Sequence, residues 1–165
     1  MIRPATEEDA ARIAAIYNYF VEQTVATFEE EPVSTAEMRS RIAAVISARY
    51  PWLVIEVHGA VCGYAYAKTW QARSAYRLTL ESTIYLAPDV IGRGLGTKLY
   101  AALVAELRST RRAHCVVGGI ALPNAGSVAL HEKLGFEPVG IFKEVGSKLG
   151  QWVDVGYWQL MLGTE

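Results

Sequence analysis

Apolar residues recur at two different spacings along the chain, and the spacing separates predicted helices from predicted strands. The clearest helical pattern has leucines at every fourth position over residues 95–107. Two earlier helices carry start signals, because Thr6 is followed three residues later by Asp9, and Ser34 by Glu37, as in capping boxes. Helices are therefore predicted from residue 6, over 34–49, from residue 95 and over 124–134.

Alternating or continuously apolar runs between these helices predict strands. Residues 52–67 show the pattern of a hairpin, with its turn at His58 and Gly59. Residues 77–87 alternate, whereas residues 114–122 are almost continuously apolar, as in a strand buried on both faces. Further strands are predicted over 1–5, 137–145 and 152–162.

The resulting order, β-α-α-β-β-β-α-β-α-β-β, predicts an α/β fold. We expect a mixed central sheet of about six or seven strands flanked by helices. No repeat, low-complexity segment or linker interrupts the 165 residues. A single domain over residues 1–165 is therefore predicted, and its length is sufficient for one hydrophobic core.

Composition narrows the possible functions. The formal net charge of −1 provides no basic surface for nucleic acid, and no apolar run approaches the roughly 20 residues of a membrane span. The first residues, "MIRPATEEDA", are acidic, unlike a signal peptide. Cys62 and Cys115 lie in apolar runs, as buried reduced thiols do, and no metal-ligand spacing occurs. A cytoplasmic protein without metal is expected.

A glycine-rich stretch, "GRGLG" at residues 92–96, separates a predicted strand from a predicted helix. Thr97 stands where the dinucleotide pattern requires a glycine, and no Gly-Lys-Ser/Thr closes a phosphate loop. Backbone N–H groups at a helix start still form an anion site. This start carries Arg93 and Lys98 and no carboxylate, which favours a negatively charged ligand. The alternative is a tight turn that only requires unusual backbone angles.

Glu81 lies in the middle of the strand that leads into this glycine stretch. Strand alternation places it on one face with Thr79, Thr83 and Tyr85. Carboxylates are depleted in strands, and a carboxylate in a partly dry cleft can take a proton from an amine, directly or through water. The alternative is a solvated or ion-paired glutamate on an open face.

The strand, "GRGLG", the following helix and "NAGSVALHEKLGF" together resemble the GCN5-related N-acetyltransferases. Four further segments resemble one branch of that family, the phosphinothricin and methionine sulfoximine acetyltransferases, over almost the whole chain. These segments are "IYNYFVEQTVATFEEEP", "WQARSAYRLTLESTIYL", "ALHEKLGF" and "GSKLGQWVDVGYWQL". One position departs from the family, because Ile91 stands where a Gln or Arg donor is common.

The resemblance implies that acetyl-CoA is the co-substrate and assigns roles to individual residues. It implies that Glu81 is the catalytic base. His131 is either the acid that protonates the departing thiolate or a residue that packs beside the cofactor. The implied cofactor-binding residues are Ile84, Tyr85, Leu86, Gly92, Arg93, Gly94, Leu95, Gly96, Thr97, Asn124 and Ser127. The implied substrate-binding residues are Phe28, Arg73, Ser74, Ala75 and Tyr76.

The acceptor that these residues favour is the amino group of a small amino acid or analogue, because Arg73 suits a carboxylate or phosphinate. A protein N-terminus or a polyamine is an alternative acceptor, although a polyamine site would be lined with carboxylates. A non-catalytic acyl-CoA-binding module is a third reading, and it predicts a lost base where Glu81 is present. Which amino acid is used stays open at this stage.

Assembly is predicted from the closing strand. Trp152, Asp154, Tyr157 and Trp158 place aromatic groups along it, and exposed aromatic strands usually mark interfaces. We therefore expect a homodimer with this strand near the subunit contact.

Overall fold

The computed structural model describes residues 1–163. Within them the chain forms four α-helices: α1 (Ala10–Gln23), α2 (Thr35–Ser47), α3 (Leu95–Thr110) and α4 (Ala125–Lys133). The strands are β1 (Ile2–Pro4), β2 (Trp52–Val57), β3 (Ala60–Thr69), β4 (Thr79–Leu86), β5 (Cys115–Leu122), β6 (Glu137–Lys148) and β7 (Gln151–Met161). Three short 3₁₀ turns, η1 (Glu7–Asp9), η2 (Ser74–Tyr76) and η3 (Pro88–Val90), complete the order.

This order confirms the predicted α/β class, and the seven strands form one mixed sheet. The start signals also work as predicted, because Asp9 Oδ2 accepts from the Thr6 N–H at 2.8 Å and Ser34 Oγ from the Glu37 N–H at 3.1 Å. The structure differs from the predicted ranges at several element ends, and two of these differences matter most. The first helix opens with η1 before it becomes α-helical, and β6 continues to Lys148 rather than ending at residue 145.

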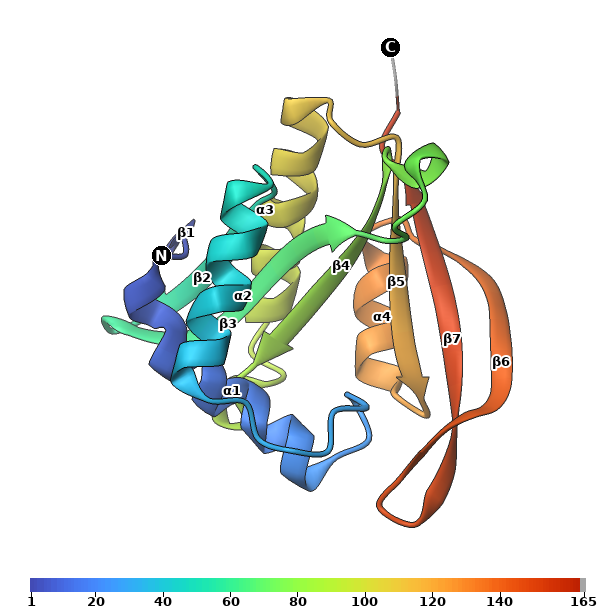
Figure 1. Cartoon of the computed structure of the whole chain (residues 1–165), viewed down its shortest axis with the longest axis horizontal. Helices are drawn as coiled ribbons and strands as arrows, with labels where there is room; N and C mark the ends of the chain where they lie inside the picture. Colours follow the sequence, from blue (N-terminus) through green and yellow to red (C-terminus); the bar gives the residue numbers. More distant parts are fainter. Residues whose placement is uncertain (164–165) are drawn as a thin grey trace.

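The strand order in the sheet is β1-β2-β3-β4-β5-β7-β6. Every neighbouring pair is antiparallel except β4 and β5, which are parallel. These two strands pair only where Thr79, Leu80 and Glu81 lie opposite Cys115, Val116 and Val117. Beyond Glu81 they diverge (Figure 1). The remainder of β4 is therefore unpaired on the side that faces β5.

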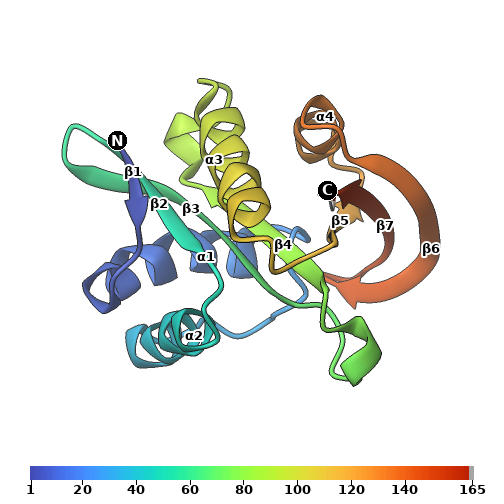
Figure 2. The same cartoon turned by 90° about the horizontal axis from the view of Figure 1, so that it is seen from above.

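Helices cover both faces of the sheet. α1 and α2 lie on one face, and α3 and α4 lie on the other (Figure 2). The predicted leucine stripe of α3 is buried, since Leu99, Leu103 and Leu107 are at most 2% exposed. The largest fully buried side chains come from both layers: Tyr64, Tyr100, Ile13, Ile16, Met38, Ile42, Leu80, Leu99, Leu103, Leu107, Val21 and Val54.

The closing strand is only partly available for a subunit contact. Trp152 is 68% exposed, but Trp158 is 6% exposed and its Nε1 donates to Glu132 Oε1 at 3.1 Å. The prediction of a subunit contact is therefore wrong for Trp158, because this indole packs into the core beside α4.

Cys62 and Cys115 are buried and free, as predicted. None of the helices described is long and apolar enough to cross a membrane.

Candidate active site

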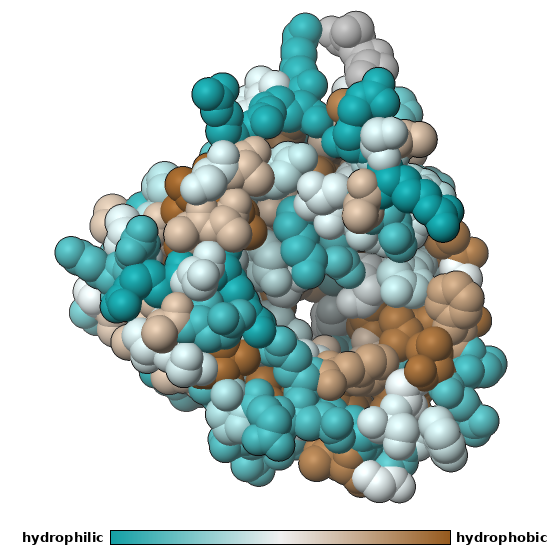
Figure 3. Space-filling view, viewed as in Figure 1, coloured by the Kyte–Doolittle hydropathy of each residue, from teal (hydrophilic) through white to brown (hydrophobic). Residues whose placement is uncertain are grey.

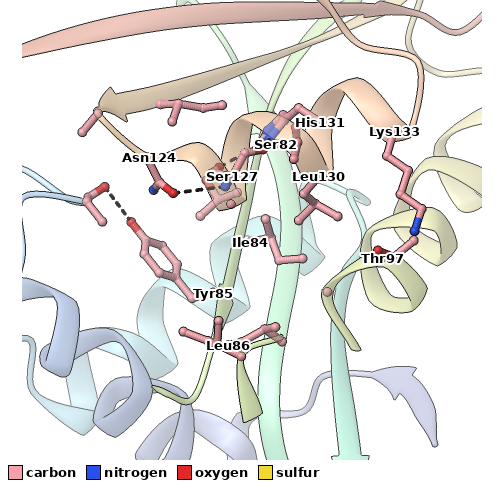
Figure 4. A pocket seen from close by; sticks show the side chains of 18 of the residues that line it. Ser82, Ile84, Tyr85, Leu86, Thr97, Asn124, Ser127, Leu130, His131 and Lys133 are labelled. Atoms are coloured by element: carbon pink, nitrogen blue, oxygen red, sulfur yellow. Dashed lines mark hydrogen bonds between the residues drawn. The ribbon is translucent and has the colours of Figure 1, made fainter. Parts of the chain in front are cut away.

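A cavity of about 510 Å³ lies at the place where β4 and β5 diverge. This volume falls within the range of small-ligand sites. Figure 3, which has the same viewpoint as Figure 1, shows a hollow near the centre of the molecule, and Figure 4 shows the side chains around the cavity. The predicted residues that line it are Glu81, Ile84, Tyr85, Leu86, Gly92, Gly94, Gly96, Thr97, Asn124, Ser127 and His131.

The glycine loop supplies an open backbone surface at the start of α3. Gly92 and Gly94 have φ angles of +84° and +75°, and a Cβ at either position would meet no atom within 4 Å. Gly94 is the N-cap of α3, whose first turn contains no acidic residue. Free space, exposed N–H groups and the positive end of the helix dipole together fit an anionic group such as a diphosphate.

Gly96 has a different role in the same loop. A Cβ there would lie 3.3 Å from Leu86 Cδ1 and 3.6 Å from Leu130 Cδ2. The missing side chain therefore allows α3 to pack closely against β4 and α4, which keeps the loop beside the cavity.

Lys133 adds a positive charge that the sequence did not reveal. It lines the cavity from the end of α4, and its side chain extends toward Thr97 at the start of α3 (Figure 4). Arg93, the predicted cation of the loop, is exposed and is not among the lining residues, nor is Leu95. A lysine in the last turn of the helix that opens at Asn124 was the available signal, but its reach depends on how α3 and α4 pack.

The open edge of β4 forms one wall. Ile84, Tyr85 and Leu86 pair with β3 on one side, whereas the ladder to β5 ends at Glu81. An exposed strand edge can pair with an extended ligand as an added strand would.

The start of α4 forms the opposite wall. Asn124 Oδ1 accepts from the Ser127 N–H at 3.0 Å and so caps the helix (Figure 4). Both residues line the cavity. Capping fixes the Asn124 side chain at the mouth of the gap between β4 and β5.

His131 lies at the end of a buried chain of hydrogen bonds. Its Nδ1 is 2.7 Å from the Ser127 carbonyl oxygen, and since a carbonyl only accepts, Nδ1 carries the hydrogen. Nε2 of the neutral ring then accepts from the Tyr100 hydroxyl at 3.0 Å, and Tyr100 accepts from Ser82 Oγ at 2.7 Å. Burial lowers the pKa of His131, and the bond to Ser127 opposes this shift. The ring is 4% exposed and both nitrogens are engaged.

Glu81 lies at the narrow end of the cavity, where the pairing of β4 with β5 stops. Its side chain is 31% exposed, and Oε2 is 3.7 Å from Lys68 Nζ. Burial, together with the charge of Glu81, raises the pKa of Tyr157 on β7. The carboxylate thus lies between β3 and β7 in a half-buried position, where it can accept a proton from a bound amine.

The five residues predicted to bind substrate do not line the cavity. Phe28 is 42% exposed, and its ring packs against the backbone of Gly146, leaving no room for a Cβ there. Ser74, Ala75 and Tyr76 form the exposed turn η2 directly before β4, and Arg73 is its N-cap. They lie at the end of β4 that carries Glu81, outside the cavity.

Several lining residues were not predicted. Ser82 lies on β4 beside the predicted base, and it is 6% exposed. Ile91 lines the cavity and is 57% exposed, so an apolar side chain stands at this edge of the cavity. The others are Phe20, Ala26, Thr83, Gly119, Ile120, Ala121, Gly126, Ala129, Leu130 and Lys133.

The fold and the cavity together define an acetyltransferase. The sequence profile of the acetyltransferase (GNAT) domain matches residues 2–156. The chain is 42% identical to a phosphinothricin N-acetyltransferase of Streptomyces viridochromogenes over 158 residues, which cover 96% of this chain and 85% of that protein. The chain belongs to the GNAT acetyltransferase family.

Two further proteins are similar over nearly the whole chain. One is an L-methionine sulfoximine/L-methionine sulfone acetyltransferase of Salmonella typhimurium, 38% identical over 98% of this chain and 94% of that protein. The other is the crystal structure of a phosphinothricin acetyltransferase from Sinorhizobium meliloti in complex with acetyl-CoA. It superimposes with a TM-score of 0.95 at 38% identity, covering 99% of this chain and 88% of that one. The family predicted from the sequence is confirmed.

Proposed function

We propose that the protein transfers the acetyl group of acetyl-CoA to the amino group of a small amino acid or analogue, of the phosphinothricin or methionine sulfoximine and sulfone type. One observation carries this proposal: a single cavity joins an anion-binding helix start to the carboxylate of Glu81. The names of the similar proteins support the same substrate class. A non-catalytic module would not need a carboxylate at that place.

The cavity residues suit the parts of acetyl-CoA, which supplies the acetyl group as a thioester. The loop residues Gly92, Arg93, Gly94, Leu95, Gly96 and Thr97 would hold the diphosphate with backbone N–H groups. Lys133 adds a cation to this site. The open β4 edge at Ile84, Tyr85 and Leu86 would pair with the amides of the pantetheine arm, and Asn124 and Ser127 at the start of α4 would contact that arm from the other side.

Glu81 is proposed as the general base. An amino acid arrives at neutral pH mainly as an ammonium ion, which has no lone pair with which to attack. The half-exposed carboxylate takes one proton from it, directly or through a water molecule. The neutral amine would then attack the thioester carbonyl carbon, and the C–S bond would break with its electron pair on the sulfur. The nitrogen loses its second proton as the amide forms, and that proton would neutralise the departing thiolate, directly or through solvent.

His131 is proposed to pack and position rather than to donate a proton. Its Nε2 accepts a hydrogen bond and its Nδ1–H is directed at a backbone carbonyl. The neutral ring therefore has no proton directed at the cavity. A thiol is a tolerable leaving group, because its pKa of about 8.5 lies close to neutrality.

The acceptor is proposed to enter beside Glu81, between the exposed turn at Arg73, Ser74, Ala75 and Tyr76 and the loop that carries Phe28. Arg73 provides a planar cation that suits a carboxylate or phosphinate. Because these residues lie outside the cavity, they would contact the part of the substrate that is remote from the amino group.

We also propose a homodimer and a cytoplasmic location for this one-domain protein. Exposed apolar residues gather on the β6–β7 hairpin, on the right of Figure 3: Val139, Ile141, Phe142, Val145, Leu149 and Trp152. A patch of this kind supports a subunit contact. Two free buried cysteines support a reducing compartment. A light-scattering mass equal to the 18.1 kDa of one chain at all dilutions would contradict the dimer.

The substrate class is tested by acetyl-CoA turnover, followed as the release of free thiol. The panel contains phosphinothricin, methionine sulfoximine, methionine sulfone, spermidine and a short peptide with a free N-terminus. Turnover is expected with one or more of the first three. Turnover with spermidine or the peptide alone would replace the proposal with the alternative acceptor.

A further inference from the structure

Lys148, the last residue of β6, is a buried lysine that has no carboxylate partner among residues 1–163. It is 3% exposed, and among the described residues no acidic oxygen lies within salt-bridge distance of its ammonium. Its Nζ donates to two backbone carbonyls, Thr27 at 2.8 Å and Phe20 at 3.3 Å. Lysine is rarely buried unless it is paired, so this arrangement requires an explanation.

The two carbonyls belong to the end of α1 and to the loop that follows it. Phe20 lies in the last turn of α1, where carbonyl groups have no helical partner and a cation is favoured. Thr27 lies in the middle of the loop over residues 24–31. The ammonium group of Lys148, on the β6–β7 hairpin, therefore links the end of α1 to the loop that follows α1.

A second contact from the same strand holds the same loop. Gly146, two residues before Lys148, lies directly against the Phe28 ring, and there is no space for a Cβ at this glycine. The other side of the loop is held from the sheet and from α1. Tyr85 Oη donates to the Ala26 carbonyl at 3.4 Å (Figure 4), and Tyr17 Oη lies 2.7 Å from Thr27 Oγ1.

A bulge in β6 allows the hairpin to reach the loop. The register with β7 shifts between Phe142 and Gly146. Asp154 on β7 holds the extra residues, because its carboxylate accepts from Lys143 Nζ at 2.7 Å and from the Glu144 N–H at 2.8 Å. Bulges bend a strand, and the part of β6 beyond this one contacts the α1–α2 connection.

The loop matters because it borders the cavity. Ala26 of the loop lines the wall together with Phe20 at the end of α1, and Phe28 projects from the loop. We propose that Lys148 is a positioning residue: from the β6–β7 hairpin it holds the loop over residues 24–31 in the position that completes the acceptor side of the site. The effect on the acceptor rests on the proposed function, whereas the anchoring of the loop does not.

The test replaces Lys148 with Met, which keeps the length of the side chain and removes the ammonium. The matched control is Glu137→Gln, at the start of the same strand, where the side chain is exposed and lies before the bulge. Backbone hydrogen exchange is measured over residues 24–31 in all proteins. Lys148→Met is expected to speed exchange in this loop at least tenfold, and the control is expected to leave it unchanged.

Kinetics supply the second measurement. The Michaelis constant for the amine is expected to rise about tenfold in Lys148→Met, with a smaller change for acetyl-CoA, because displacement of a positioning group weakens productive binding. Gly146→Ala is a second variant that displaces Phe28 without touching the lysine, and the same pattern is expected. If Lys148→Met does not fold, Gly146→Ala still tests whether contacts from β6 hold the loop in place for the acceptor.

The outcomes distinguish the anchoring of the loop by Lys148 from the proposed acetyltransferase function. Unchanged exchange over residues 24–31 in a folded Lys148→Met protein would overturn the anchoring. Faster exchange with an unchanged Michaelis constant for the amine would overturn the positioning role at the acceptor side. If the wild-type protein acetylated no amine of the panel, the proposed function would fail, and the exchange experiment would still decide whether Lys148 holds the loop.

Discussion

Lys68 Nζ lies 3.7 Å from Glu81 Oε2, and the two residues lie directly opposite each other on β3 and β4. Their side chains are 50% and 31% exposed, so water screens the attraction and the pair contributes little to stability. An incoming ammonium ion can therefore replace Lys68 as the ion-pair partner of the carboxylate. Lys68 also places a cation on the side of the site where Arg73 is proposed to face the acceptor.

Replacing Glu81 with Gln tests the proposed base. The amide keeps the shape of the side chain but cannot take a proton, so kcat at pH 7 is expected to fall by ~10²–10⁴-fold. The Michaelis constant for acetyl-CoA is expected to stay nearly unchanged. Raising the pH should recover part of the rate, because more of the amine then arrives neutral.

Glu137→Gln is the matched control, since Glu137 is an exposed strand glutamate on β6 and does not line the cavity. Its kinetics should equal those of the wild type. A Glu81→Gln enzyme with a near wild-type kcat at pH 7 would show that another group, or water, removes the proton.

Replacing Gly94 with Ala tests the backbone cradle. The new methyl group would enter the open space above the loop, where the diphosphate is proposed to bind. Gly59→Ala is a close control, because Gly59 has φ +79°, against +75° at Gly94, and equally open surroundings, but lies in the β2–β3 turn. Both variants should lose a similar stability, about 1–2 kcal/mol from the left-handed backbone.

Only Gly94→Ala should raise the Michaelis constant for acetyl-CoA, by about tenfold or more. The measurement is acetyl-CoA saturation at a fixed amine concentration. Equal Michaelis constants for acetyl-CoA in the two folded variants would mean that Gly94 shapes the turn and does not contribute to acetyl-CoA binding.

Local signals explain why much of the fold was predictable. The Ser34 and Glu37 pair starts α2 where the sequence places it, and Leu99, Leu103 and Leu107 of α3 are buried as their spacing predicts. Such features depend on contacts within one turn of helix or along one strand. The glycine loop was predictable for the same reason, because the residues that shape it are consecutive.

The parts that were missed depend on packing between distant segments. Lys133 reaches the cavity because α4 lies beside α3 (Figure 4), and its position in the last turn of α4 does not by itself indicate that packing. The contact of Lys148 with Thr27 joins residues 121 positions apart. Trp158 looked available for a partner, but α4 covers it. The acceptor residues came from a resemblance alone, and the structure leaves them outside the cavity.

Lys133→Met tests the cation that the structure added to the cofactor site. Removing one charged hydrogen-bond donor costs roughly 1.5 kcal/mol, which corresponds to about a tenfold rise in the Michaelis constant for acetyl-CoA. Lys98→Met is the control, because Lys98 is exposed in the first turn of α3 and does not line the cavity. A larger effect at Lys98 than at Lys133 would restore the assignment made from the sequence.

The last prediction concerns the protonation of His131. Burial lowers the pKa of this ring in the folded protein, whereas an unfolded histidine has a pKa of about 6.5. Between the two pKa values the unfolded chain binds more protons than the folded protein, so the free energy of unfolding rises with pH in this window. The rise is complete above about pH 6.5. As the pH falls from 7 to 5, the wild type should lose about 1.4 kcal/mol for each unit by which the pKa is lowered.

His131→Gln should remove this loss, because glutamine does not titrate. Urea unfolding at several pH values measures the difference between the two proteins. The exposed His58 and His114 are present in both and cancel in the comparison. The pKa values of Asp9 and Glu29 are lowered, mainly by their bonds to Arg3 and Arg41. Their contribution is present above an unfolded pKa of about 4, so it is lost only at lower pH.

The same variant separates the two roles of His131 in catalysis. A glutamine oxygen can still accept from the Tyr100 hydroxyl, so a ring that only positions Tyr100 and Ser82 should be replaced with less than a tenfold loss of kcat. A general acid would cost ~10²–10⁴-fold. A loss of that size, in a protein whose unfolding no longer depends on pH between 5 and 7, would show that the ring carries a proton to the departing thiolate despite its burial.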